Sequence, residues 1–282
     1  MTHLITGATG ALGQAIVAQV QARNAAEACA LGARDPSRLA ASGFRTQRVD
    51  YDDLASMREA FKGVSTLLLI SSNASNEARM RQHAAAIDVA AEVGVERIVY
   101  TSFVGADQPD DNPLLEVHHD TERRLRQSGL SWVALRNGLY LDSLLDLLGS
   151  FRETRVVAHP AGEAPAAWIS RDDIAAFTVD VLLDPEVRDV ALEVVLPETH
   201  SFRTILRRVE EGTGVEVRYT QPSEDEYPSM LLDVGLDPGT VQVLTEVFGA
   251  MRSGALDRSN QEFERRLGRA PESLASYLGR NL

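Results

Sequence analysis

Three glycines near the start of the sequence have the spacing with the clearest chemical meaning. Gly7, Gly10 and Gly13 lie in ITGATGALG, after a short apolar run and before a helical pattern. Glycine allows a sharp turn after a strand, close approach of the backbone to a ligand, and tight packing of a helix on a strand. Amide groups at the start of that helix attract an anion. The spacing predicts a site for the diphosphate of a dinucleotide, with a plain strand–turn–helix corner as the alternative.

An arginine follows the second expected strand. Arg34 lies in ALGARDPSR, where an acidic residue would accept from ribose hydroxyls and an arginine can bind a 2′-phosphate. Arg38 offers a second positive charge, whereas Asp35 precedes Pro36 and suits a turn or a helix cap. Arg34 therefore favours NADP(H) over NAD(H), and a solvated loop arginine is the alternative.

An acidic residue ends the third expected strand. Asp50 lies in RVDYDD, where its carboxylate could accept from the adenine amino group and Tyr51 could pack beside the ring. The alternative is that Asp50 or Asp52 caps the next helix.

Small polar residues end the fourth and fifth expected strands, where the nicotinamide half of a dinucleotide would run. Their hydroxyls and amides can hold ribose and phosphate oxygens, although such residues are also frequent at strand ends without a function. They are Ser71, Ser72 and Asn73 after the fourth strand, and Tyr100, Thr101 and Ser102 after the fifth.

Two adjacent histidines in VHHDTERRL raise the question of a metal site. His118 and Glu122 share a helix face, but His119 points about 100° away, and no second cluster completes a ligand set. We therefore expect no metal. We expect His118 to donate a hydrogen bond to the cofactor ribose or nicotinamide, with a helix-surface histidine as the alternative.

The sixth expected strand leads into polar side chains in ALRNGLY. Asn137 offers a donor and an acceptor, and Tyr140 offers a phenol and an aromatic face. We expect both at the mouth of a crevice, although Tyr140 would also suit a half-buried core position.

Apolar runs alternate with helical patterns in the first half, which predicts a parallel sheet with right-handed crossovers. The continuously apolar run TLLLIS is typical of a strand covered on both faces. A ligand would lie at the carboxyl ends of these strands. We expect strands at 2–7, 28–33, 44–50, 66–71, 97–102 and 132–138, and helices at 11–23, 53–61, 76–93 and 116–128.

The pattern loosens after residue 138, where prolines punctuate short segments. We expect residues 1–138 to bind the cofactor and residues 139–282 to form a smaller mixed α/β lobe that binds the substrate, with some strands returning to the main sheet. The expected strands are 154–158, 192–196 and 215–220, and the expected helices are 171–183, 201–212, 223–234, 238–251 and 272–279.

Composition narrows the class of protein. The 282 residues are 44% hydrophobic, and their net charge of −13 argues against nucleic acid or an acidic membrane as partner. No apolar run approaches the roughly 20 residues of a membrane span, and no signal peptide is evident. We expect a soluble cytoplasmic protein. Its single cysteine, Cys29, suits a buried core position, and its single lysine, Lys62, suits a solvated helix end.

These stretches together resemble the NmrA-like family of atypical short-chain dehydrogenases/reductases, with its quinone-reducing bacterial members most similar. The motifs ITGATGALG, ARDP, VDYDD, LLLISS, YTS, H-x-x-TE and LRNGLY occur in the family's order and spacing, and RDDIAA also fits. The resemblance covers most of the chain and is strongest over residues 1–140. It implies an α/β fold, a Rossmann-type doubly wound parallel sheet, with NADP(H) as the cofactor.

The resemblance also implies a set of site residues. Typical members of the superfamily use a tyrosine and a lysine four residues later, and no tyrosine here has such a lysine. His118 resembles the replacement near the lysine position, and the segment LDS after Tyr140 departs from the family pattern. The residues expected to contact the cofactor are Gly7, Ala8, Thr9, Gly10, Ala11, Leu12, Gly13, Arg34, Asp50, Ser71, Ser72, Tyr100, Thr101, Ser102, Asn137, Gly138, Leu139 and Tyr140.

The leading hypothesis is an NADPH-dependent reductase of a quinone or a similar electron-poor carbonyl compound. Asn137, Tyr140 and His118 are its expected catalytic residues, and Asn137 or Tyr140 would donate to the developing oxyanion. Two alternatives share the cofactor site: a non-catalytic NADP(H)-sensing regulator, and a reductase or isomerase of a specialised pathway. The sequence carries no signal for the oligomeric state.

Overall fold

The computed structural model describes residues 2–109 and 111–282. The chain divides into two compact units, each discontinuous in sequence. One change of unit, between Arg136 and Asn137, lies next to the boundary expected at residue 138. Unit 1 consists of Met1–Phe103, Val117–Arg136 and Arg171–Leu192, and unit 2 of Val104–Glu116, Asn137–Ser170 and Glu193–Leu282.

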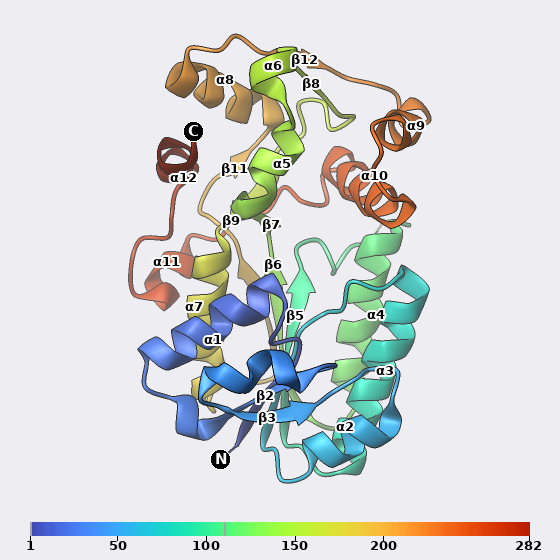
Figure 1. Cartoon of the computed structure of the whole chain (residues 1–282), viewed down its shortest axis with the longest axis vertical. Coiled ribbons are helices and arrows are strands. Elements are labelled where there is room, and N and C mark those ends of the chain that lie inside the picture. The colour runs from blue at the N-terminus through green and yellow to red at the C-terminus, as the bar shows by residue number, and fades with distance from the viewer. Residues whose placement is uncertain (1, 110) are drawn as a thin grey trace. The chain divides into compact units, whose positions relative to one another are not determined.

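A seven-stranded sheet forms the centre of unit 1, in the order β10-β6-β5-β4-β1-β2-β3 (Figure 1). The pairs β1–β2, β1–β4, β2–β3 and β4–β5 are parallel. The order from β3 to β6 is that of a Rossmann-type doubly wound sheet, which confirms the predicted fold class. The strands are β1 (His3–Ile5), β2 (Cys29–Ala33), β3 (Arg45–Arg48), β4 (Thr66–Leu69), β5 (Arg97–Phe103), β6 (Ser131–Asn137) and β10 (Val190–Val194).

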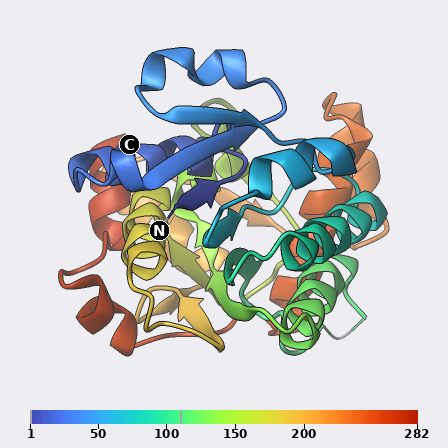
Figure 2. The same cartoon turned by 90° about the horizontal axis from the view of Figure 1, so that it is seen from below.

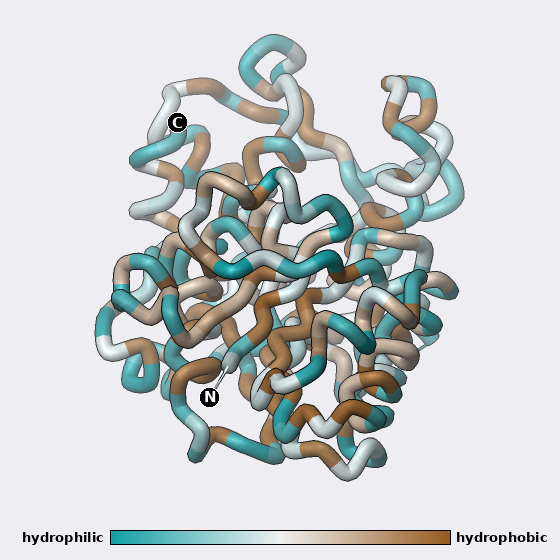
Figure 3. Tube along the Cα trace, turned by 60° about the horizontal axis from the view of Figure 1, so that its bottom comes forward, coloured by the Kyte–Doolittle hydropathy of each residue, from teal (hydrophilic) through white to brown (hydrophobic). Residues whose placement is uncertain are grey.

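Burial differs between the central and edge strands of this sheet. Every residue of β1, β2 and β4 is buried, whereas β3 at the edge exposes Arg45, Gln47 and Arg48. Figure 3 shows hydrophobic chain concentrated along the inner strands, with hydrophilic chain in the outer turns. Central parallel strands are covered by helices on both faces, so they need apolar residues on both sides.

Helices cover both faces of the sheet (Figures 1 and 2). One face carries α1 (Ala11–Ala22) and α7 (Arg171–Leu183), which pack against each other. The other carries α2 (Leu54–Phe61), α3 (Asn76–Glu92) and α4 (Pro113–Gln127). The helix α4 begins three residues before the expected position because Asn112 Oδ1 accepts from the amides of Leu114 and Leu115. Proline at position 113 suits the first helical position, where its missing N–H costs nothing.

A buried arginine joins the second-half helix α7 to the sheet. Arg97 in β5 is only 5% exposed. It donates to the carbonyl oxygens of Leu182 (2.7 Å), Asp184 (2.6 Å) and Val187 (3.0 Å), at and just beyond the end of α7. The last carbonyls of a helix lack intrahelical donors and carry partial negative charge, so a guanidinium satisfies both needs.

Unit 2 contains two small sheets, ordered β11-β9-β7 and β12-β8. The expected segments at 154–158 and 215–220 correspond to β8 and β12, whereas no expected strand corresponds to β7, β9 or β11. The strands are β7 (Leu139–Tyr140), β8 (Val156–Ala158), β9 (Ala166–Ile169), β11 (Thr199–His200) and β12 (Arg218–Thr220). The helices are α5 (Leu144–Leu148), α6 (Phe151–Thr154), α8 (Phe202–Thr213), α9 (Glu226–Asp233), α10 (Pro238–Arg252), α11 (Glu262–Leu267) and α12 (Leu274–Asn281).

The single cysteine and the single lysine have the surroundings that the sequence predicts. Cys29 is fully buried in β2, and this burial raises its pKa to about 11, so it is a core thiol. Lys62 follows α2, where its exposed ammonium group lies 2.6 Å from Glu59. Across residues 2–109 and 111–282, no helix combines the length and hydropathy that crossing a membrane requires.

Candidate functional site

The glycine loop connects β1 to α1 in unit 1. Gly7 has a φ of +62°, a left-handed conformation that side chains disfavour. A Cβ atom on Gly13 would lie 2.3 Å from the carbonyl oxygen of Gly7 and 2.8 Å from the Cα of Ala8. Gly7 thus allows the turn, and Gly13 allows contact between the helix and loop backbones. The turn at Gly7 is the role that the sequence predicts, whereas Gly13, expected to pack the helix on the strand, lies against the loop residues Gly7 and Ala8.

The start of α1 fits an anion. The helix has twelve residues, its N-cap Gly10 offers no side-chain hydrogen bond, and its first turn holds no acidic residue. Gly10 and Ala11 are exposed. The first amides of a helix have no intrahelical acceptor, so this end presents free donors and a positive dipole. The loop therefore has the surroundings that the diphosphate of a dinucleotide requires.

The end of β2 presents Arg34 as an exposed cation. Arg34 forms no ion pair within the described part of the chain. Asp35 is committed elsewhere, since its Oδ1 accepts from Ser37 Oγ at 2.6 Å and from the Ser37 amide at 3.1 Å. These hydrogen bonds hold the pKa of Asp35 below its usual range. Of the two structural roles expected for Asp35, a turn or a helix cap, the structure shows the cap, because Asp35 is the N-cap of the 3₁₀ helix Pro36–Ser42.

The acidic residues after β3 have local partners. Asp50 Oδ1 accepts from the Asp52 amide at 3.1 Å, and Asp50 Oδ2 lies 3.5 Å from Arg48. The N-cap of α2 is Asp53, whose Oδ1 accepts from the amides of Ala55 and Ser56. The alternative of Asp50 or Asp52 as the helix cap is therefore wrong, because the helix begins one residue later.

Tyr51 ties together the ends of two strands. Its hydroxyl lies 2.5 Å from Thr6 Oγ1 and donates to the carbonyl oxygen of Ile70 at 2.9 Å. Burial raises the pKa of this phenol. The hydroxyl is thus held between the chain that leaves β1 and the chain that leaves β4.

The three residues expected from the end of β5 turn their side chains inward. Tyr100 is fully buried, and Thr101 Oγ1 accepts from the Ser71 amide at 2.9 Å. Ser102 is 3% exposed and donates to Glu122 Oε1 at 2.7 Å. These hydrogen bonds hold β5 to its neighbours, and the expected contact of these residues with a cofactor stays a prediction.

A buried arginine that was not among the predicted site residues contacts both Ser71 and His118. Arg79 of α3 is 7% exposed, and its Nη2 lies 2.9 Å from Ser71 Oγ and 2.8 Å from His118 Nε2. His118 Nδ1 lies 2.8 Å from the Tyr100 hydroxyl. An arginine i−4 to a histidine on one helix, Arg79 and His83 in RMRQH, was the available signal of an inward polar face.

These contacts fix the state of His118. A guanidinium can only donate, so His118 Nε2 accepts and the ring hydrogen lies on Nδ1, facing Tyr100. Burial, with Arg79 and His83 nearby, lowers the pKa of His118 well below its usual value. Both ring nitrogens are therefore used inside unit 1. The expected role of His118 toward a ligand would therefore require one of these two contacts to be exchanged.

His83 and Glu122 are the other ionisable groups of this interior. His83 Nδ1 lies 2.9 Å from Thr121 Oγ1, and burial lowers the pKa of His83 to about 3. Glu122 is 1% exposed and accepts from Arg136 Nη2 and Arg126 Nη2, each at 2.8 Å. In the part of the chain that the structure describes, no three histidine, cysteine or acidic side chains are grouped to hold a metal.

Unit 2 contains the segment Asn137–Tyr140. Asn137 is 1% exposed, and both polar atoms of its side chain lack a hydrogen-bond partner among the described residues. A Cβ atom on Gly138 would lie 2.9 Å from the Ala167 carbonyl oxygen, and Leu139 and Tyr140 form β7 beside β9. Buried amides are almost always paired, so the Asn137 side chain is exceptional among the predicted site residues that the structure describes.

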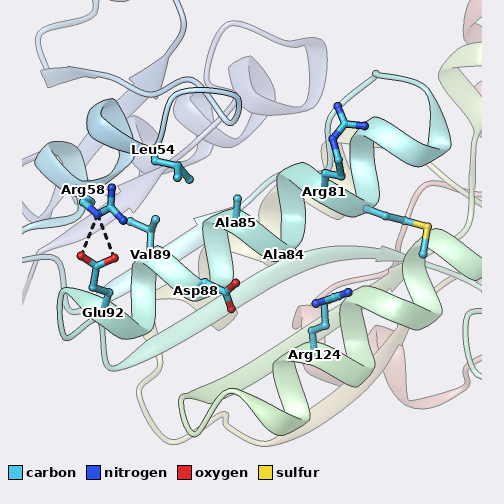
Figure 4. A pocket seen from close by; sticks show the side chains of 10 residues that line it. Leu54, Arg58, Arg81, Ala84, Ala85, Asp88, Val89, Glu92 and Arg124 are labelled. Carbon is cyan, nitrogen blue, oxygen red and sulfur yellow. Dashed lines mark hydrogen bonds and ion pairs between the residues drawn. The ribbon is translucent and has the colours of Figure 1, made fainter.

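A surface groove of about 530 Å³ lies elsewhere on unit 1, over α2, α3 and α4 (Figure 4). Its floor includes Ala84 and Ala85, and Arg58 forms a two-pronged ion pair with Glu92. None of the predicted site residues lines it.

Comparisons with known proteins bear on this site. The model of an NAD(P)H-binding family matches residues 7–185. Quinone oxidoreductase 2 of Escherichia coli is 31% identical over 261 residues, which cover 90% of each chain. An NmrA-like family domain-containing oxidoreductase of Aspergillus flavus is 29% identical, covering 79% of this chain and 76% of its own. The crystal structure of an NADPH-dependent quinone oxidoreductase from E. coli, complexed with NADPH, superimposes with a TM-score of 0.92 at 29% identity, covering 99% of each chain.

The contact at Gly13 predicts a severe effect of one methyl group. Gly13→Ala should lower the free energy of unfolding by about 1–3 kcal/mol, because the new Cβ atom meets backbone atoms that cannot move aside. Gly279→Ala in α12 is the control, since its Cβ would meet nothing within 4 Å. The control should gain about 0.5–1 kcal/mol from improved helix propensity. Urea unfolding followed by circular dichroism measures both, and a Gly13→Ala protein as stable as wild type contradicts the contact.

The burial of His83 predicts acid sensitivity. Unfolded His83 gains a proton as the pH falls below its ordinary pKa of about 6.5, whereas the folded ring stays neutral down to about pH 3. Stability therefore falls with falling pH over this window. His83→Phe should reduce that slope by about 1.4 kcal/mol per pH unit. Thr121→Val, which keeps the histidine, should retain it. Unfolding free energies measured at several pH values give the slopes, and an unchanged slope in His83→Phe refutes the assignment.

Proposed function

This chain belongs to the NAD(P)H-binding family with its NmrA-like oxidoreductases, and from that premise we propose that it reduces quinones or related electron-poor carbonyl compounds with NADPH. It is an NAD(P)H-binding oxidoreductase that acts on a small molecule. The observation that carries the proposal is the uncapped start of α1, where Gly13 lies so close to the Gly7 carbonyl oxygen that a Cβ atom would not fit between them. The named quinone oxidoreductase relatives support the substrate class.

We assign the parts of the cofactor to residues of the chain. The loop Gly7–Gly13 would hold the diphosphate through its amides. Arg34 would bind the adenosine 2′-phosphate, because it is exposed and unpaired within the described chain while Asp35 is held by Ser37. Ser71 and Ser72 would hold the ribose of the nicotinamide half. The order of the sheet supports this division, because β2 and β4 flank β1 on opposite sides.

Reduction of a quinone by NADPH would require little acid catalysis from the protein. A bound nicotinamide supplies the hydride, and water can supply the proton to the quinol oxygen. The Asn137 side chain, buried and unpaired within the described residues, would donate to the oxygen that becomes negative, with Tyr140 three residues further along the chain. Gly138 and Leu139 would contact the cofactor through the backbone. Lys62 has no part in this, because it is exposed beside Glu59.

Arg34 should determine the choice of cofactor. Removing its charge in Arg34→Ala should weaken NADPH binding about 10–100-fold and leave NADH binding within twofold, because only NADPH carries the 2′-phosphate. Arg38→Ala is the matched control, a nearby exposed arginine whose loss should matter less. Titration calorimetry with both cofactors gives the ratio. An NADPH preference that survives Arg34→Ala would rule out this assignment.

Asn137 should affect turnover more than binding. Asn137→Ala should lower the rate of NADPH oxidation with a panel of quinones about 10–100-fold, with a smaller change in KM, because the amide would act on charge that develops in the transition state. Tyr140→Phe tests the phenol separately. Unchanged rates in both variants would remove these residues from the mechanism. Tight NADPH binding without turnover of any acceptor would favour a cofactor-sensing regulator.

A further inference from the structure

The side chain of Ser72, just beyond β4, is connected to an acidic residue through two hydrogen bonds. Ser72 Oγ lies 2.6 Å from Gln82 Oε1, and Gln82 Nε2 lies 2.8 Å from Asp52 Oδ2. Gln82 is 8% exposed, whereas Asp52 is exposed. All three residues belong to unit 1, on three different segments of its chain.

The chemistry of the three groups fixes the direction of every hydrogen bond. A carboxylate can only accept, so Asp52 requires that the amide nitrogen of Gln82 face it. The Gln82 oxygen must then face Ser72, and the Ser72 hydroxyl must donate its only hydrogen to that oxygen. Toward anything else, Ser72 Oγ has only lone pairs to offer.

The neighbouring serine has the opposite role toward its protein partner. Ser71 Oγ accepts from the guanidinium of Arg79 at 2.9 Å, and Asp52 has no part in that contact. The two adjacent hydroxyls are therefore controlled by two different charged residues, one that only donates and one that only accepts.

We propose that Asp52, acting through Gln82, is a positioning residue that makes Ser72 an acceptor for a ribose hydroxyl of the nicotinamide half and closes this point to phosphate. The inference rests on the proposed function. A phosphate oxygen beside Ser72 would set lone pair against lone pair, whereas a ribose hydroxyl can donate to it. The nicotinamide half is the relevant one, because β4 lies on the side of β1 away from β2 and Arg34.

Two ligands separate the halves of the cofactor. The compound 2′-phospho-ADP-ribose contains the second ribose, and 2′,5′-ADP lacks it. Ser72→Ala and Asp52→Lys should each weaken binding of the first about 3–10-fold, the effect of one hydrogen bond. The ratio of the two dissociation constants, 2′-phospho-ADP-ribose to 2′,5′-ADP, should therefore rise by the same factor in both variants. A general effect of charge acts on both ligands and cancels in this ratio. Lysine can only donate, so Asp52→Lys turns the Gln82 amide around. The Gln82 nitrogen then occupies one lone pair of Ser72 Oγ and releases its hydrogen, so Ser72 is no longer held as an acceptor.

A double variant and a charge control complete the test by calorimetry. Ser72→Ala with Asp52→Lys should bind 2′-phospho-ADP-ribose no more weakly, relative to 2′,5′-ADP, than Ser72→Ala alone, because Asp52 acts only through Ser72. Asp88→Lys makes the same charge change at an exposed position of α3 and should leave the ratio unchanged. Equal losses of affinity for both ligands, or additive losses in the double variant, would contradict the role of Asp52 through Gln82 and leave the proposed function standing. If wild-type protein binds neither ligand, both the proposed function and the role of Asp52 are contradicted.

Discussion

The contact between Gly13 and the Gly7 carbonyl oxygen is the constraint on which the site depends. It brings the backbone of α1 against the loop at the end of β1, at a distance where a methyl group cannot fit. The free amides of α1 therefore lie directly beyond β1, whose neighbours in the sheet are β2 and β4. A longer loop could not hold the helix start so near the strand, and the anion site would lose its place relative to β2 and β4. The fold positions the site through a backbone contact, and no side chain in this loop is asked to supply charge.

Several polar side chains near that loop are held in place by hydrogen bonds to other residues of unit 1. Arg79 fixes the ring of His118 and the oxygen of Ser71, Tyr51 joins the ends of β1 and β4, and Thr101 holds the Ser71 amide. Each buried donor or acceptor that is paired keeps its neighbour in one orientation, because an unpaired polar group in the interior is costly. The exception among the predicted residues described is the Asn137 side chain in unit 2, which is buried without a partner there. That contrast is the reason why we propose Asn137 as the residue that acts on the substrate.

Two buried charged residues of unit 1 form hydrogen bonds that stabilise the fold. Arg97 satisfies three carbonyl oxygens at and beyond the end of α7, and Glu122 gathers Ser102, Arg126 and Arg136. Both arrangements join segments that are far apart in sequence, with Arg97 bound to residues 85–90 positions away. Breaking one partner of such a cluster leaves a buried charge uncompensated, so these residues constrain the fold more than their number suggests.

The sequence by itself determined the features that depend on neighbours along the chain. The alternation of apolar strands and helices, the glycine loop, the cap at Asp35 and the burial of Cys29 are each encoded within a few residues, and the structure has them. The tertiary structure decided which side chains face inward. His118 and Ser102 lie where the sequence places them, but Arg79 and Tyr100 occupy the two ring nitrogens of His118, and Glu122 accepts from Ser102. The reason is physical: periodicity reports one element at a time, whereas the partner of a buried polar atom comes from another element that only folding brings near.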